Sequence, residues 1–228
     1  LKSSGTETRI DIPFINQGSI FANAGNLHFG ATGTFTQTSG NITVAAGATA
    51  QLDQGLNLAG GSLVGSGTVI AGNGTGNVTV TNTTFISPGS ILGQLTIQGN
   101  LDLAATSQIL FDLSGAGTGR VNDFLSVTGT AMLRGTLTLN LVNGAYATIL
   151  PQDSFTLISA ATLSGTFANA ANGARFFASD LQSSFLVTYT SNSLTLKEFT
   201  TTIPEPSTWA LLITGLAALA FTTLRRRP

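Results

Sequence analysis

The chain has 228 residues, of which 8% are charged and 42% hydrophobic, and its net charge is −1. This near-neutral balance argues against nucleic-acid binding, and the high apolar fraction argues against a disordered chain. The sequence has no cysteine, which excludes disulfides and Cys-based zinc sites. Abundant Thr, Gly, Val, Leu and Ile favour strands and tight turns over helices.

A short unit recurs in the first half of the chain: a glycine, one further residue, then alternating apolar positions. Each copy predicts a strand that starts from a turn and buries one face. The expected strands cover residues 25–29, 40–44, 67–70, 76–80, 93–97 and 99–103. His28 lies between Leu27 and Phe29 and is therefore expected to face solvent. As the only histidine it cannot form a Ser-His-Asp triad or a His-based metal cluster, and we expect no metal or cofactor.

The spacing between these units is irregular, which argues against a strict short-period solenoid. We predict an all-β fold: an irregular right-handed parallel β-helix with several strands per coil, whose stem covers residues 1–103. Between Ile12 and Leu101 the only formal charge is Asp53. Stacking explains this, because like charges on successive coils would lie only about 4.8 Å apart.

Longer strands are expected in the second half of the chain, which we predict to be a β-rich cap or stem region over residues 104–199. They cover residues 109–113, 125–133, 137–141, 155–158, 185–189 and 194–196. The stretches ISPGSILGQLTIQGNLDLAATSQILFDLSG, DFLSVTGTAMLRGTLTLNL and DSFTLISAATLSGTF lie within residues 86–167. This region resembles the C-terminal passenger region of autotransporter adhesins. The resemblance implies a β-helix stem closed by a stabilising β-cap.

The C-terminal tail is the longest apolar stretch. Residues 200–206 are expected to be an extended linker, and residues 207–228 a transmembrane helix followed by Arg225, Arg226 and Arg227. The apolar run 209–224 would span about 24 Å as a helix, against about 30 Å for the hydrocarbon core of a bilayer. The expected membrane anchor comprises Trp209, Leu211, Leu212, Ile213, Leu216, Leu219, Phe221 and Leu224. The arginines should remain cytoplasmic, which places residues 1–206 outside the cytoplasm.

The order of Pro204-Glu205-Pro206, apolar helix and terminal arginines resembles the PEP-CTERM sorting signal of Gram-negative bacteria. The resemblance implies export, transient anchoring in the inner membrane, and recognition and cleavage by an exosortase. It also implies association with the cell surface or the exopolysaccharide matrix. The visible chain starts at Leu1 without a signal peptide, so we interpret it as a mature form or a C-terminal fragment.

Paired carboxylates are the one catalytic arrangement that the sequence leaves open. Asp102 and Asp112 are candidates for a glycoside-cleaving pair if they lie on neighbouring coils. The more conservative interpretation is that the acids, Asp123 and Asp153 among them, cap turns or occupy outward strand positions.

We therefore expect a non-enzymatic structural or adhesive protein of the cell surface or extracellular matrix. Its expected partners are the exosortase and inner membrane, then exopolysaccharide or another copy of the chain, but not nucleic acid. The alternatives are a polysaccharide-active enzyme using Asp102 and Asp112, an ice-binding protein, or a stem whose function lies upstream of Leu1. Ice binding would need threonines stacked in register, and the irregular spacing of pairs such as Thr36/Thr38 and Thr79/Thr81 argues against it.

Overall fold

Short segments in which apolar and polar residues alternate form the strands of this chain, and glycine-rich turns separate them. The strands stack in successive coils instead of forming one broad sheet. The computed structural model describes residues 2–3, 6–30, 35–115 and 121–201. In this part of the chain the regular structure is strand, apart from two 3-10 turns, η1 (Gly72–Gly74) and η2 (Ala145–Ala147). The prediction of an all-β fold is confirmed, and the expected strands are present.

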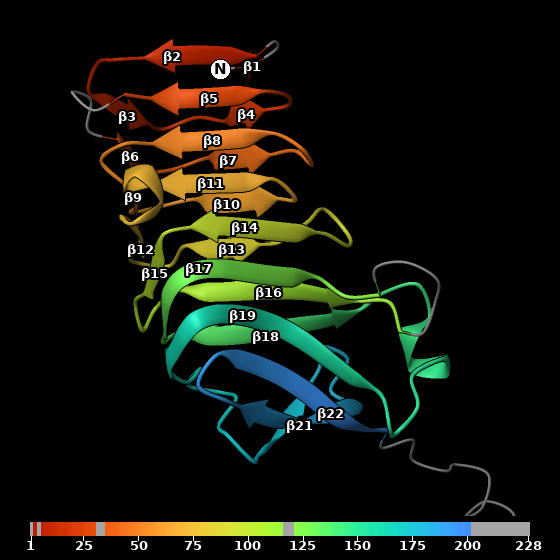
Figure 1. The fold of residues 1–228 in the computed structure, drawn as a ribbon. Coiled ribbons are helices and arrows are strands. Elements are labelled where there is room, and N and C mark those ends of the chain that lie inside the picture. The colour runs from red at the N-terminus through yellow and green to blue at the C-terminus, as the bar shows by residue number, and fades with distance from the viewer. Residues whose placement is uncertain (1, 4–5, 31–34, 116–120, 202–228) are drawn as a thin grey trace, which may run out of the picture.

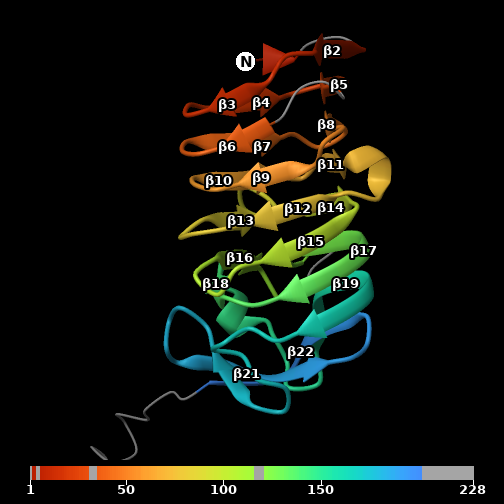
Figure 2. The same ribbon diagram turned by 90° about the vertical axis from the view of Figure 1, so that its left-hand side faces the viewer.

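Three columns of parallel strands form the body (Figures 1 and 2). Column A contains β1 (Lys2–Ser3), β4 (Ile20–Ala22), β7 (Asn41–Val44), β10 (Ser62–Gly65), β13 (Phe85–Ser87), β16 (Gln108–Leu113) and β18 (Thr136–Leu141). Column B contains β2 (Glu7–Ile10), β5 (Asn26–Phe29), β8 (Thr49–Leu52), β11 (Thr68–Ala71) and β14 (Gln94–Gln98). Column C contains β3 (Phe14–Asn16), β6 (Phe35–Gln37), β9 (Leu56–Leu58), β12 (Asn77–Val80) and β15 (Asn100–Leu103).

Each coil of this β-helix-like stack visits columns A, B and C in turn. Two long strands, β17 (Phe124–Leu133) and β19 (Ser154–Gly165), then run through both column B and column C. Spacing along the chain varies between paired positions, from 19 residues between Thr49 and Thr68 to 33 between Leu125 and Ile158. The irregular spacing noted in the sequence therefore reflects connections of unequal length between strands that remain in register.

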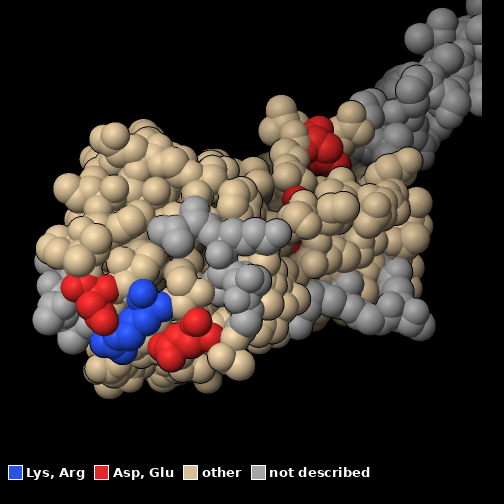
Figure 3. Space-filling model, turned by 90° about the horizontal axis from the view of Figure 1, so that it is seen from above, with Lys and Arg blue, Asp and Glu red and all other residues tan. Residues whose placement is uncertain are grey.

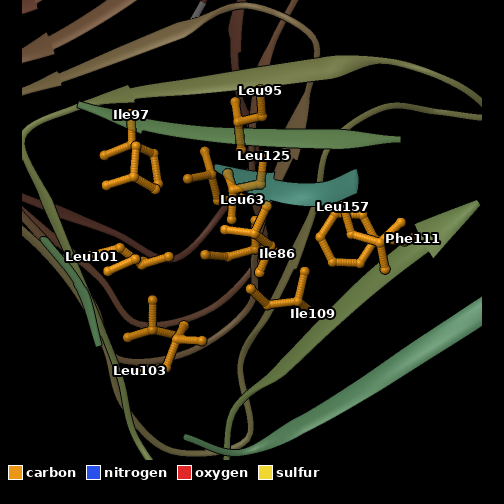
Figure 4. Packing of buried hydrophobic residues seen from close by; sticks show 14 of the residues in the cluster. Leu63, Ile86, Leu95, Ile97, Leu101, Leu103, Ile109, Phe111, Leu125 and Leu157 are labelled. Atoms are coloured by element: carbon orange, nitrogen blue, oxygen red, sulfur yellow. The ribbon is translucent and has the colours of Figure 1, made fainter. Parts of the chain in front are cut away.

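The core is a single continuous cluster that fills the interior of the three columns and continues into the antiparallel strands at the C-terminal end. Figure 4 shows side chains from all three pointing into one interior: Leu63, Ile86 and Ile109 from column A, Leu95 from column B, and Leu101 and Leu103 from column C. All of these side chains are buried. Burying one Leu or Ile side chain contributes about 1.5–3 kcal/mol, and no single coil encloses such a core alone.

An antiparallel cap closes the C-terminal end of the stack. It contains β20 (Arg175–Phe177), β21 (Ser183–Tyr189) and β22 (Ser193–Thr201), and β22 pairs with β19. The parallel coils thus continue past residue 103 to β19 before the cap begins (Figure 1). β22 also includes residues 200–201, the first two of the expected linker.

Candidate functional site

A polar network around His28 connects the first three coils. Arg9 on β2, His28 on β5 and Gln51 on β8 are paired across column B, all on its outward face. His28 is nevertheless only 6% exposed. The expectation that this side chain faces solvent was wrong, because side chains from the coils on either side cover it.

Both ring nitrogens of His28 have protein partners. Nε2 lies 2.9 Å from Asp53 Oδ1, and Nδ1 lies 2.9 Å from Glu7 Oε1 and 3.1 Å from Arg9 Nη1. A carboxylate only accepts, so the Asp53 contact requires a proton on Nε2. Nδ1 donates to Glu7 when it carries a proton and accepts from Arg9 when it does not, so in each state one of these two contacts is a hydrogen bond.

Asp53 is the acceptor at the inner end of this network. Burial raises the pKa of its carboxyl, but hydrogen bonds from His28 and Gln51 lower it, as do the charges of His28 and Arg9. The combined effect holds the pKa of Asp53 below its ordinary value of 3.8. Asp53 is therefore stabilised as a carboxylate within the stack.

The geometry of the network is suited to linking neighbouring coils and not to catalysis or metal binding. The two carboxylates meet opposite nitrogens of one ring, so they do not converge on a shared metal position. Among the described residues, no group of three His, Asp or Glu side chains could hold a metal ion. Neither nitrogen of His28 is left to serve as a general base toward a substrate.

The two carboxylates proposed as a glycosidase pair lie on different sheets. Asp102 is on β15 in column C, where it accepts from Arg134 at 2.5 Å. Asp112 is on β16 in column A, where its Oδ1 accepts from Asn140 at 3.0 Å. Each carboxylate thus has its own partner on the following coil.

Three further aspartates bind backbone N–H groups, as turn-capping acids do. Asp123 is fully buried and accepts from the N–H groups of Gly93 (2.7 Å) and Asp112 (3.0 Å). Asp153 accepts from Leu150 N–H at 2.8 Å. Asp180 accepts from the backbone N–H groups of Gln182 and Ser183. Partial burial raises the pKa of its carboxyl, but these hydrogen bonds outweigh burial and the pKa is lowered.

A row of hydroxyl groups follows column B down the outer surface, and we refer to it as the hydroxyl row. It consists of Thr49, Thr68, Thr96, Ser126 and Ser159, paired one per coil and each partly exposed. Single threonines therefore stack in register in this column despite the irregular spacing along the chain, and two serines continue the row. The Thr-x-Thr pairs themselves do not stack, since Asn57 lies between Thr36 and Thr79 in column C.

A groove of about 410 Å³ lies between η2 and the cap, and we refer to it as the cap groove. It is lined by Tyr146, Asp180, Gln182, Ser183 and Thr201. The Tyr146 side chain is 65% exposed. An open aromatic ring beside carboxylate, amide and hydroxyl groups is suited to a polar ligand with apolar faces, such as a sugar ring. This groove could not be predicted from local sequence, because only the fold brings η2 beside the cap.

The predicted sorting motif, membrane anchor and terminal arginines all lie outside the described residues. Among the described residues, no helix has the length and apolar character needed to cross a membrane. The boundaries proposed for the tail therefore stay predictions.

No protein-family model matches the chain, and neither a curated protein nor a solved structure is significantly similar to it.

Proposed function

We propose that the chain is an exported structural and adhesive protein of the cell surface or extracellular matrix, whose β-helical body displays an uncharged polar surface. We further propose that the coils wind in the right-handed sense, which parallel crossover connections adopt in about 98% of cases.

The observation that best supports this proposal is the composition of the outer rows. Their polar groups are largely hydroxyls and amides that bind across coils, as in the pairs Asn77–Asn100 (3.1 Å) and Asn41–Ser62 (2.7 Å). Such a surface is suited to binding polysaccharide, because sugar hydroxyl groups can donate hydrogen bonds to, and accept them from, Thr, Ser and Asn side chains.

Two surfaces would contact a polysaccharide. The hydroxyl row repeats at the strand spacing of about 4.8 Å, and the cap groove offers the exposed ring of Tyr146. Sugar rings stack on aromatic side chains through their apolar faces, so we assign Tyr146 the main adhesive contact.

The tail supplies the proposed address. Pro204, Glu205 and Pro206, the apolar run 209–224 and the three arginines would hold the chain transiently in the inner membrane, with the body outside the cytoplasm. Release by an exosortase would then deliver the body to the surface or matrix.

Cell fractionation tests the proposal directly. Deleting residues 204–228 should abolish surface and matrix placement, since the address is removed while the described body stays intact. Tyr146→Ala provides the matched control: it should reach the surface normally, but cells should retain less of it on their polysaccharide.

Two results would contradict the proposal. The truncated chain would fractionate like the full chain if the tail were not an address. Equal retention of Tyr146→Ala and the wild type would argue against adhesion through the cap groove while leaving the sorting proposal intact.

A further inference from the structure

A shallow hollow lies on the outer surface of the stack, where the turns that leave column C lead into column A (Figure 2). It has a volume of about 240 Å³, and three successive coils contribute to it through the starts of β13, β16 and β18 and the turns before β13 and β16. We refer to it as the column A hollow. It is lined by Thr83, Thr84, Phe85, Thr106, Gln108 and Thr136.

Phe85 gives the column A hollow an aromatic surface. It lies on the outward face of column A, in a row with Ser62 on the preceding coil and Gln108 on the following one. Its side chain is 37% exposed, although both neighbours in the row are polar. A partly exposed ring on a sheet face offers a flat apolar surface on which a ligand ring can stack.

Polar groups beside this ring are held in place by contacts between coils. Thr106 Oγ1 donates to the carbonyl oxygen of Asn82 on the preceding coil at 2.8 Å, and Gln108 Nε2 donates to Thr138 Oγ1 on the following coil at 2.6 Å. A hydroxyl has one proton and two lone pairs, and an amide oxygen only accepts. The Thr106 hydroxyl and the Gln108 amide oxygen are therefore acceptors, which suits a ligand that brings several hydroxyl donors.

Charge narrows the class of ligand further. None of the residues that line the hollow is charged. Seen from the β2 end of the stack, the surface is largely uncharged, with acidic and basic atoms gathered in a few places (Figure 3). A carboxylate placed in the hollow would lose hydration without gaining a cationic partner from its walls. A neutral ligand incurs no such cost.

We propose that the column A hollow binds one unit of a neutral polysaccharide, with the sugar ring stacked on Phe85 and its hydroxyls donating to Thr106 and Gln108. The volume is below the roughly 300–1,000 Å³ of pockets for drug-sized ligands, so it suits a single ring. This inference rests on the proposed adhesion to polysaccharide. It deepens that proposal, because it names the class of polysaccharide and adds a site apart from the hydroxyl row and the cap groove.

Tryptophan fluorescence of the full chain tests the proposal, in a detergent without a sugar headgroup. Phe85→Trp keeps an aromatic ring in the hollow and adds a reporter to a chain whose own tryptophan is Trp209. At least one of three neutral probes, cellohexaose, maltohexaose and mannohexaose, should change the added emission until it saturates, and the acidic probe hexagalacturonate should not. Phe21→Trp is the matched control, since Phe21 is also in column A and 43% exposed but does not line the hollow, and it should not respond.

Calorimetry with the neutral probe that responds then measures the contribution of the ring. Every protein in this series carries Tyr146→Ala, so that the cap groove adds little to the signal. Adding Phe85→Ala should weaken binding about threefold to tenfold, because the stacking surface is removed. Adding Phe85→Trp should leave binding close to that of the parent. Unchanged circular dichroism spectra would show that both variants remain folded.

No response to any of the three neutral probes would overturn the proposal. So would an equal response to hexagalacturonate, or equal affinities of the parent and the Phe85→Ala variant. Unchanged fractionation after deletion of the tail would contradict the sorting proposal without altering these titrations, so the two failures are distinguishable.

Discussion

Many outward polar side chains in this protein have hydrogen-bond partners about one coil away. Asn100 donates to Asn77 across 23 residues, and Ser62 donates to Asn41 across 21. His28 follows the same rule, with Glu7 on one side and Asp53 on the other. Hydrogen bonds between side chains therefore reinforce the stacking that the backbone ladders establish.

Asp53→Asn should destabilise the fold by about 1–2 kcal/mol at pH 7, because a charged acceptor of His28 is replaced by a neutral one. The lowered pKa of Asp53 means that the folded state binds its proton less readily than the unfolded state. Its stabilisation is thus complete above the ordinary pKa of 3.8 and is lost as the pH falls through the lower, folded-state value. Urea unfolding of both proteins at a series of pH values measures the difference.

Asp102→Asn is the control for this comparison, since Asp102 and its partner Arg134 are 44% and 50% exposed. An exposed ion pair of this kind contributes about 0–1 kcal/mol. A difference between wild type and Asp53→Asn that stays constant down to strongly acidic pH would contradict the role assigned to Asp53.

The network around His28 could not be predicted from local sequence. Alternation correctly identifies position 28 as lying on the outer face of its strand, but burial there depends on which residues lie on adjacent coils. Glu7 and Asp53 are 21 and 25 residues away. Their contact with His28 could have been predicted only if the number of residues per coil had been known.

Among the elements, most strands of four or more residues were predicted, although β2, β8 and β10 were missed, and none of the shorter strands was predicted. The expected strands at 40–44 and 76–80 correspond to β7 and β12. The three-residue strands β4, β9 and β13 escaped prediction, because three residues hardly distinguish alternation from chance. Without them, the three-column coil was not visible in the sequence.

The turns depend on glycine where successive coils approach closely. Gly61 has φ +78°, and a Cβ added there would overlap the carbonyl oxygen of Gly40 on the preceding coil. Gly47 has nearly the same φ, +77°, but an added Cβ would meet no atom within 4 Å. The two positions therefore share the backbone requirement and differ in the available space.

Gly61→Ala should consequently be more damaging than Gly47→Ala. The left-handed conformation costs an L-residue about 1–2 kcal/mol at both positions, and the overlap at Gly61 should add roughly 1–3 kcal/mol. Thermal and urea unfolding of both variants test this expectation. Equal losses of stability would show that the coils can separate enough to admit a methyl group.

At the scale of the whole molecule, the cap determines how the stack ends. Phe185 on β21 is fully buried. Its ring centroid lies 6.2 Å from that of Phe155 on β19 and 5.1 Å from that of Phe199 on β22. These rings connect the last parallel coil to the antiparallel strands. Without that connection, the far edge of β19 would be open to other chains.

Phe185→Ala should therefore lower stability by about 3–5 kcal/mol and promote aggregation on mild heating. Phe177→Ala, at a cap position that is 48% exposed, is the matched control and should behave nearly like the wild type. Light scattering during a temperature ramp distinguishes them. Identical aggregation temperatures would show that the cap does not protect the stack.

The connections between strands differ in length while the strands stay in register, so the stack tolerates coils with different numbers of residues. Because each coil contacts only its neighbours, duplicating one coil would lengthen the body by about 4.8 Å and leave the remaining contacts unchanged. Natural variants of different length should therefore differ by whole turns of the stack, and the reach of the body from its attachment point would change in equal increments.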